Sequence, residues 1–527
     1  MVDFGEVLRT IGEFGLFQQL TLIALCFPNF TQPFILASFI FIQSDPERHC
    51  NTDWILRADP DLSTGEQLNL TLPREEDGSF SRCRMFVPVD WNISDIREHG
   101  LNETTGCRDG WVYTNSLYEA TIVTDFDLVC GQTYIVQVIQ TVFMAGVLIG
   151  SLVFGPFAES FGRKRATQIP SVIMFVSIVT TALSPGVYLY IASQFLVGFG
   201  AGGFRVNCII LSTEWIGVSK RSWGACMTQL FSALGQCALA VMIYFVRNWR
   251  LAQLITAAPL AVVVVYIWFI PESARWLLSR GRTEEAKKLI IKAATINKRP
   301  VPDDLLEKVS VSNTVNKGGL KIIFRSAILT RYFLIVVLAW FSSNLTVYSL
   351  YLNIGNLGLN IFLTQLLFGI SEIPASLLSM WLLEIFGRKP LFIATLLTGG
   401  LSAILILAVP EGLSIVVTCL VVAARFFLLW AVSVTCVLMQ ELTPTPVRQT
   451  ATALGTISGR LGGLVAPPLN ILSMFSRVIP ISVYSSLTLV SGVLGLLLPE
   501  TKNKELPETV EEAENNRNVS QRNSTKL

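Results

Sequence analysis

The sequence is poor in charge and almost without histidine. Of its 527 residues only 15% are charged, compared with about 25% in soluble proteins, and 51% are hydrophobic. Both histidines, His49 and His99, fall in one hydrophilic stretch, which excludes a histidine metal site or proton relay inside an apolar span. The net charge of +2, without a basic tract that carries interleaved aromatic residues, gives no indication of nucleic-acid binding.

The motifs of catalysis are missing as well. The sequence contains no nucleophile–base set, no glycine-rich phosphate loop and no metal-binding cluster. We therefore predict neither an enzyme nor an ATP-driven pump, and no cofactor or metal. A channel is disfavoured because no segment resembles a selectivity filter.

Long apolar runs are what the sequence has in abundance. Twelve runs of about 20 residues or more are each sufficient to cross a bilayer as a helix. They run from Phe17 to Gln43 and over residues 133–155, 168–187, 188–211, 223–246, 250–270, 332–353, 358–384, 390–409, 413–440, 448–474 and 480–499. The sequence therefore predicts an all-α integral membrane protein with twelve transmembrane helices.

Three landmarks occur twice at a nearly constant offset. Glu159-Ser160-Phe161-Gly162-Arg163-Lys164 recurs 225 positions later as Glu384-Ile385-Phe386-Gly387-Arg388-Lys389. Glu214 with Arg221 recurs 227 positions later as Glu441 with Arg448, and Pro271-Glu272-Ser273 recurs 228 positions later as Pro499-Glu500-Thr501. Three repeated motifs at nearly the same offset predict two homologous six-helix halves, residues 17–270 and 332–499, in the same orientation.

The hydrophilic loop 44–131 differs from every other segment. It carries seventeen Asp or Glu and seven Arg but no Lys. Its four cysteines, Cys50, Cys83, Cys107 and Cys130, predict two disulfides with three alternative pairings. Its three glycosylation sequons begin at Asn69, Asn92 and Asn102. Clustered with paired cysteines, they place the loop outside the cytosol.

Basic residues accumulate on the other side of the membrane. The connector 271–331 holds thirteen Lys or Arg against six Asp or Glu, and Thr283 to Asn297 has the periodicity of an amphipathic helix. Because Lys and Arg set orientation, twelve spans place residues 1–16, the connector and the tail 500–527 in the cytosol.

Several motifs resemble those of a known transporter family. Gly155-x-x-x-Glu159-x-x-Gly162-Arg163-Lys164-Arg165 is similar to the major facilitator signature, with Glu159 where aspartate is commoner. Pro271-Glu272-Ser273-Ala274-Arg275-Trp276-Leu277-Leu278 and Glu441-Leu442-Thr443-Pro444-Thr445-Pro446-Val447-Arg448-Gln449-Thr450 resemble signatures of the organic ion transporter (solute carrier 22) family. The chain looks most like its organic anion branch, in particular the nicotinate- and urate-exchanging transporter and its riboflavin-associated relative.

The repeated charges are candidates for a gate on the cytosolic side. Cross-helix pairs there would form when this side is shut and separate when it opens. The candidates are Glu159, Arg163, Glu214, Arg221, Glu272 and Arg275 in the first half, and Glu384, Arg388, Glu441 and Arg448 in the second. The alternative is that they only set topology.

Three arginines, Arg205, Arg425 and Arg460, lie inside apolar spans, where a charge is a functional hypothesis by default. Arg460 lies among small residues and could hold a carboxylate. The resemblance implies the same role, because anion carriers of the family tend to have arginine there. The alternative is a structural ion pair with Glu372 or a contact at a helix end. Arg425 matches a basic position of the family, and its role is either structural or to steer anions toward the cavity. Arg205 matches no motif of the family.

Four aromatic residues are further candidates for the substrate cavity: Tyr348, Phe368, Phe231 and Trp430. Tyr348 and Phe368 match aromatic positions of the family, and the alternative for all four is packing between helices or against lipid. Ser376 is neutral where the family often has Lys or Arg, which favours a less charged substrate than a dicarboxylate.

We therefore expect a plasma-membrane transporter of small organic anions, such as nicotinate, urate or similar aromatic monoanions, that works by alternating access, with a counter-anion as a further partner. A riboflavin or other vitamin transporter, an organic cation or carnitine-like zwitterion carrier, and a transport-dead membrane sensor are the alternatives.

Overall fold

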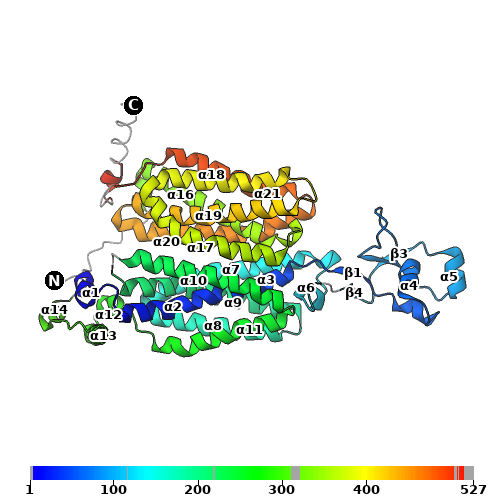
Figure 1. Ribbon diagram of the computed structural model, residues 1–527, viewed down its shortest axis with the longest axis horizontal. Helices are drawn as coiled ribbons and strands as arrows, with labels where there is room; N and C mark the ends of the chain where they lie inside the picture. Colours follow the sequence, from blue (N-terminus) through cyan, green and yellow to red (C-terminus); the bar gives the residue numbers. More distant parts are fainter. Residues whose placement is uncertain are drawn as a thin grey trace.

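The computed structural model describes residues 4–114, 117–217, 220–309, 321–503, 507 and 510–514. Long helices lie side by side in two layers, the first half of the chain in one layer and the second half in the other (Figure 1). Short helices cover one end of the bundle, and a small domain projects from the opposite end.

Twelve long helices form the bundle within the described residues. The first half contains α2 (Leu16–Ile35) with its continuation α3 (Ala37–Ile42), α7 (Tyr134–Phe161), α8 (Arg163–Leu183), α9 (Val187–Trp215), α10 (Arg221–Phe245) and α11 (Trp249–Tyr266). The second half contains α16 (Ala327–Leu352), α17 (Ile361–Phe386), α18 (Arg388–Leu405), α19 (Ser414–Leu442), α20 (Thr445–Ile471) and α21 (Val478–Leu494). The predicted all-α membrane fold is confirmed.

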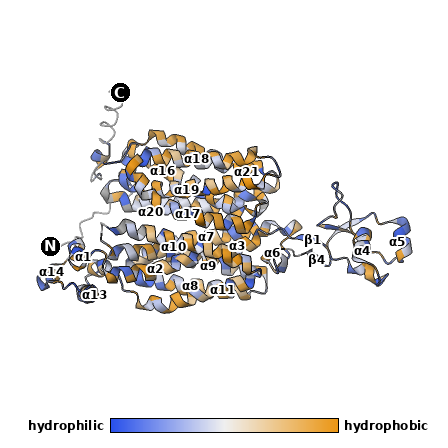
Figure 2. Cartoon of the chain, viewed as in Figure 1, coloured by the Kyte–Doolittle hydropathy of each residue, from blue (hydrophilic) through white to orange (hydrophobic). Residues whose placement is uncertain are grey.

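Among the residues that the structure describes, eleven helical spans are long and apolar enough to cross a membrane by length and composition. The twelfth helix, α20, is 27 residues long but less apolar, because threonine, glycine and Arg460 interrupt its apolar residues. Hydrophobic residues predominate along the helices of the bundle, and hydrophilic residues gather at its left-hand end and in the small projecting domain (Figure 2). Many large hydrophobic side chains are exposed, such as Phe269 at 81%, as expected for a surface that meets lipid.

Glycines bring α7 and α9 into backbone contact. A Cβ atom on Gly150 would lie 2.1 Å from the carbonyl oxygen of Phe199, and one on Gly202 would lie 2.2 Å from that of Val147. Gly146 and Gly198 make the same kind of approach one turn away. This interlocking of small residues is how helices pack closely in a membrane, where burial from water supplies no driving force.

The short helices define one end of the molecule, here called the connector face. They are α1 (Phe4–Ile11), α12 (Ala274–Ser279), α13 (Thr283–Ile296), α14 (Asp303–Lys308) and α15 (Lys321–Arg325). The predicted amphipathic helix is confirmed as α13, which buries Ala286, Ile290 and Ala293. Asn297, at its end, accepts a hydrogen bond from the backbone N–H of Phe17 (2.8 Å), so the connector is attached to the first helix of the bundle.

The opposite end carries the loop domain, residues 44–131, and is here called the loop-domain face. It contains α4 (Thr64–Thr71), α5 (Ile93–His99), α6 (Ile122–Asp125) and two antiparallel strand pairs, β1 (Glu47–Cys50) with β4 (Trp111–Thr114) and β2 (Arg84–Phe86) with β3 (Thr104–Gly106). Of the three alternative pairings, the structure contains Cys50–Cys107 and Cys83–Cys130. Asn69, Asn92 and Asn102 are all exposed.

Candidate functional site

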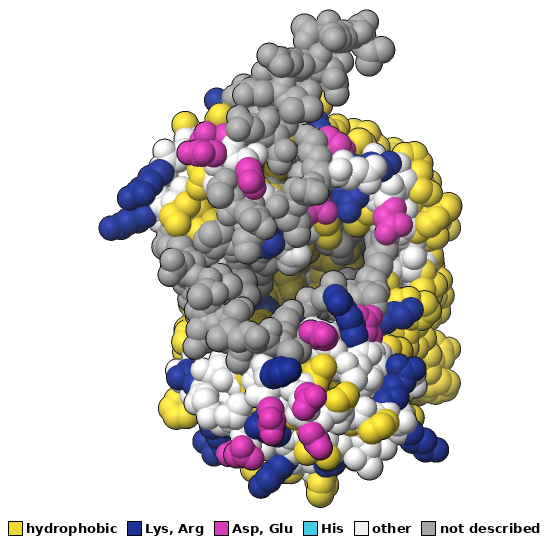
Figure 3. All heavy atoms as spheres, turned by 90° about the vertical axis from the view of Figure 1, so that its left-hand side faces the viewer, with side chains coloured by type: hydrophobic (Ala, Val, Ile, Leu, Met, Phe, Trp, Pro, Cys, Tyr) yellow, Lys and Arg dark blue, Asp and Glu magenta, His cyan; other side chains and the backbone are white. Residues whose placement is uncertain are grey.

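A cavity of about 520 Å³ lies between the two halves of the bundle. Its lining reaches Ser212 and Thr213 near the end of α9 and Gly224 near the start of α10, all close to the connector face. Figure 3, which looks at that face, shows a hollow between the halves. The cavity is therefore open toward the connector face in this conformer.

The loop-domain face is held shut by contacts between the halves. Gln43 of the first half donates to the carbonyl oxygen of Tyr351 (3.1 Å) and accepts from the backbone N–H of Gly355. The ring of Phe362 on α17 packs against Tyr118 (centroids 6.2 Å apart) and lies under the guanidinium of Arg247 (4.6 Å). These contacts close the cavity at the end away from the connector face.

Two arginines line the cavity from opposite halves, Arg205 on α9 and Arg460 on α20. Arg205 is exposed to the cavity and Arg460 is partly buried. Neither takes part in an ion pair within the described part of the chain. Both guanidiniums are thus available to an anion.

The third arginine of the cavity, Arg425 on α19, is neutralised. Its Nη2 lies 2.7 Å from Oε1 of Glu372 on α17, and its guanidinium lies 4.3 Å from the ring centroid of Phe368. The ion pair predicted as the alternative for Arg460 is therefore made by Arg425. Phe368 is completely buried, so it supports Arg425 and does not face the cavity in this conformer.

The other predicted cavity residues divide into two groups. Tyr348, Trp430 and Ser376 line the cavity. The Tyr348 ring lies so close to α20 that a Cβ atom added to Gly463 would be 3.1 Å from it. The hydroxyl of Ser376 donates to the carbonyl oxygen of Glu372 (2.8 Å). Phe231 packs instead against the small apolar cluster around Leu22, away from the cavity lining.

Several polar lining residues escaped prediction. Gln229, Ser232 and Gln236 form a stripe along α10, and Asn29 and Asn344 come from the first helix of each half. The stripe could have been found, because polar residues spaced three and four apart share one helix face. Gln236 also bonds to Gln365 across the two halves.

The repeated charges lie near the connector face and pair within each half. In the first half Arg163 contacts Glu159 (3.1 Å) and Glu214 (3.3 Å), and in the second Arg388 contacts Glu441 (3.1 Å). These pairs are formed although the cavity opens toward the same face, so they do not by themselves close it. Their role as a gate stays a prediction.

The repeated glutamates Glu272 and Glu500 cap helices. Glu272 accepts from the backbone N–H of Lys164 (3.1 Å) at the start of α8, and Glu500 accepts from that of Arg388 (3.0 Å) at the start of α18. Gly162 and Gly387 precede these helices with positive φ, and a Cβ on either would reach the carboxylate. Burial raises the pKa of Glu272 above its usual value, and its bonds to backbone N–H groups oppose that rise.

The remaining gate candidates differ in their surroundings. The guanidinium of Arg275 lies 5.2 Å from the ring centroid of Phe4, and Arg448 donates to the carbonyl oxygen of Thr443 (3.4 Å). Glu384 is exposed, and no ion pair to it occurs within the described part of the chain. The side chain of Arg221 lies outside the described residues.

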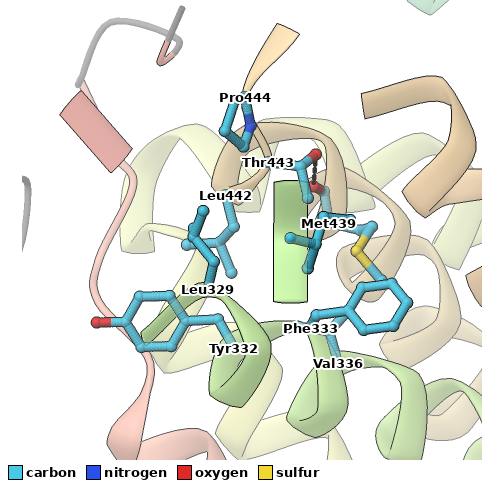
Figure 4. Close-up of a pocket in the computed structure, with 9 residues that line it drawn as sticks. Leu329, Tyr332, Phe333, Val336, Met439, Leu442, Thr443 and Pro444 are labelled. Carbon is cyan, nitrogen blue, oxygen red and sulfur yellow. Dashed lines mark hydrogen bonds between the residues drawn. The ribbon is translucent and has the colours of Figure 1, made fainter. Parts of the chain in front are cut away.

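A second pocket, at the junction of α16 and α19, is shown in Figure 4. Its volume is about 10 Å³, enough for roughly one water molecule. Leu329, Phe333, Val336 and Met439 line it, and Thr443 uses its hydroxyl to bond the carbonyl oxygen of Met439 (2.7 Å). It offers an organic solute neither space nor charge, so the central cavity is the candidate site.

Comparisons with known proteins agree with this architecture. The profile of the sugar (and other) transporter family matches residues 92–513. Solute carrier family 22 member 13 of Homo sapiens is 38% identical over 517 residues, which cover 98% of this chain and 94% of the relative. Organic anion transporter 3 of Oryctolagus cuniculus is 32% identical over 523 residues, which cover 98% and 94%.

Solved structures show the same fold. The major facilitator proton:xylose symporter XylE bound to 6-bromo-6-deoxy-D-glucose matches with a TM-score of 0.56 at 17% identity, over 94% of this chain and 99% of that one. A partially occluded inward-open conformation of the xylose transporter XylE from E. coli matches with a TM-score of 0.58 at 15% identity, over 92% and 99%.

Proposed function

We propose, from the premise that this chain belongs to the solute carrier 22 family of major facilitator transporters, that it carries small organic anions across the plasma membrane by alternating access. Transport as such follows from the family, whose members are transporters and not enzymes. The choice of anions is the proposal.

The charge of the central cavity carries this choice. Three arginines and one glutamate line it, and the glutamate is paired with Arg425, which leaves Arg205 and Arg460 without a counter-charge among the described residues. A guanidinium inside the membrane is costly, and an anionic ligand that accepts paired hydrogen bonds offsets that cost. An organic cation would meet this net positive charge with no free carboxylate to hold it, which disfavours the cation and zwitterion alternatives.

Aromatic monoanions of the size of nicotinate or urate suit the cavity lining. Tyr348 and Trp430 line the same cavity as Arg460, and a planar substrate can pack against aromatic rings. A relative named organic anion transporter 3 supports the same class. Exchange against a counter-anion and transport of riboflavin are narrower forms of this proposal. The transport-dead sensor is disfavoured because the cavity is open.

The connector face is proposed to be cytosolic. It carries the basic segments between helices, whereas the Lys-free loop domain with two disulfides and three exposed sequons suits the outside of the cell. The protein would then be multi-pass with both termini in the cytosol, and the present conformer would face inward.

The repeated charges are proposed to brace each half as it moves. The ion pairs and the caps at Glu272 and Glu500 join several helices of one half and none of the other. Such a network lets the half rock as one body, and a change in its arrangement would accompany the opening and closing of the connector face.

Uptake of labelled nicotinate or urate in cells without endogenous uptake tests the proposed function. We expect Arg460→Ala to reduce uptake at least about tenfold, because a charge-assisted hydrogen bond in a desolvated site is worth about 1.5–3 kcal/mol. Arg460→Lys should retain part of the uptake, since the charge remains but not the planar fork.

Cell-surface biotinylation must show equal amounts of each variant. Arg57→Gln, which removes an exposed arginine of the loop domain, serves as the matched control. Unchanged anion uptake by Arg460→Ala at normal surface level would contradict the assignment.

A further inference from the structure

Arg205 has a position in the cavity that the proposed function alone does not explain. We propose that it is a second anion-binding residue, and that Arg205 of the first half and Arg460 of the second hold one substrate anion between them. The inference rests on the proposed function for its ligand class, and it adds a specificity: an organic anion with two acidic groups binds more tightly than a monoanion of the same shape. This specificity departs from the expectation drawn from the neutral Ser376, because Arg205 supplies to the same cavity the positive charge that Ser376 lacks.

The two guanidiniums come from different halves of the bundle but line one cavity. Arg205 extends from the glycine-rich part of α9, where Gly202 lies against the backbone of α7, so its helix is fixed in place. Arg460 extends from α20, where Gly459, Gly462 and Gly463 allow close packing against Trp340, Phe341 and Tyr348. Both anchors are therefore rigid, and the two side chains are presented from opposite walls.

Within the part of the chain that the structure describes, no acidic residue of the cavity is left to pair with Arg205. Glu372 is the acidic residue of the lining, and its Oε1 already forms an ion pair with Nη2 of Arg425 at 2.7 Å. The other polar groups that line the cavity, such as Gln229, Ser232 and Asn344, are neutral. An exposed arginine of this kind, which faces a cavity and not lipid or headgroups, is placed to bind a ligand and not to snorkel.

Two cations that meet one ligand predict a dependence on ligand charge. A second carboxylate gains a charge-assisted hydrogen bond only if the second guanidinium is present. With both arginines, a dianion should bind at least about tenfold more tightly than its monoanionic counterpart. With Arg205 removed, the two should bind about equally.

The test uses the purified full-length protein in detergent, and its readout is the affinity obtained from thermal stabilisation by benzoate and by isophthalate, two anions of similar shape with one and two carboxylates. For the wild type we expect isophthalate to bind at least about tenfold more tightly. Arg205→Gln should abolish this ratio, and Arg205→Lys should retain most of it. Arg57→Gln, which removes a charge far from the cavity, should keep the ratio of the wild type.

Any of three results would overturn the inference. The wild type binds benzoate and isophthalate with equal affinity, it binds neither of them, or Arg205→Gln keeps the affinity ratio of the wild type. Arg205→Lys keeps the positive charge, so a retained ratio in this variant shows that the effect of Arg205→Gln is due to the charge and not to misfolding. A merely structural role for Arg205 would change the affinities for both ligands alike and leave their ratio unchanged. Failure of nicotinate and urate uptake with an intact binding ratio would contradict the proposed function and leave the second anion-binding residue in place.

Discussion

At the scale of single residues, the electrostatics of the cavity are decided by which arginine is paired. Glu372 neutralises Arg425, and the ring of Phe368 lies 4.3 Å from the same guanidinium. The pair is partly buried, so each charge depends on the other for stabilisation. Without the Glu372 carboxylate the cavity would hold three unpaired arginines and would attract anions less selectively.

This pairing predicts the effect of removing one partner. We expect Glu372→Gln to destabilise the protein by about 2 kcal/mol, because Arg425 keeps its charge but loses its counter-ion. The double variant Glu372→Gln/Arg425→Gln should be closer to the wild type in stability, since no buried charge is left over. Thermal unfolding of the four proteins of this cycle measures the coupling, and strict additivity of the two substitutions would contradict the ion pair.

At the scale of helices, the position of Arg205 depends on how closely α7 and α9 pack. Gly146 and Gly150 face Phe195 and Phe199 at distances that admit no Cβ atom. The glycines lower the helix propensity of these segments, and the contact they allow between backbones compensates for that loss.

A matched pair of glycines on α7 tests this packing. Gly150→Ala should destabilise the protein by about 1–3 kcal/mol through overpacking, because the added Cβ would lie 2.1 Å from the Phe199 carbonyl oxygen. Gly155→Ala has no atom within 4 Å of its Cβ and should be neutral or stabilising by up to about 1 kcal/mol. Melting temperatures in detergent measure both, and equal effects would show that the close approach does not matter.

At the scale of the whole molecule, the two halves are in contact at the loop-domain face, whereas a hollow lies between them at the connector face (Figure 3). The contacts of Gln43 with Tyr351 and of Phe362 with Tyr118 and Arg247 hold the first of these ends together. Transport by alternating access requires that they break in each cycle.

Cross-linking of this end should therefore stop transport. We expect Tyr118→Cys/Phe362→Cys, joined by a short reversible bifunctional thiol reagent, to lose nearly all anion uptake and to regain it on reduction. Each single-cysteine variant treated in the same way is the control, which also accounts for the native free thiols. Full uptake by a protein shown to be cross-linked would argue against rocking of the halves.

Sequence alone was sufficient for the architecture, because its signals are local or repeated along the chain. Apolar runs must become helices in a membrane, whose core offers no other partner to backbone N–H and C=O groups. The repeat of Glu159–Lys164 as Glu384–Lys389 predicted the two halves, and Arg460, Tyr348 and Trp430, which were predicted as substrate-binding residues, line the central cavity.

Only the tertiary structure decided how the charges are shared and which cysteines pair. Arg205, Glu372, Arg425 and Arg460 are far apart in the sequence, and their pairing depends on how α9, α17, α19 and α20 are rotated about their axes. The rotation of each helix also decides where its aromatic side chains lie. Phe368 packs against the guanidinium of Arg425, and Phe231 packs against the cluster around Leu22. A pattern along one chain specifies a helix and its faces, whereas the neighbour that each face meets is specified by the packing of the whole bundle.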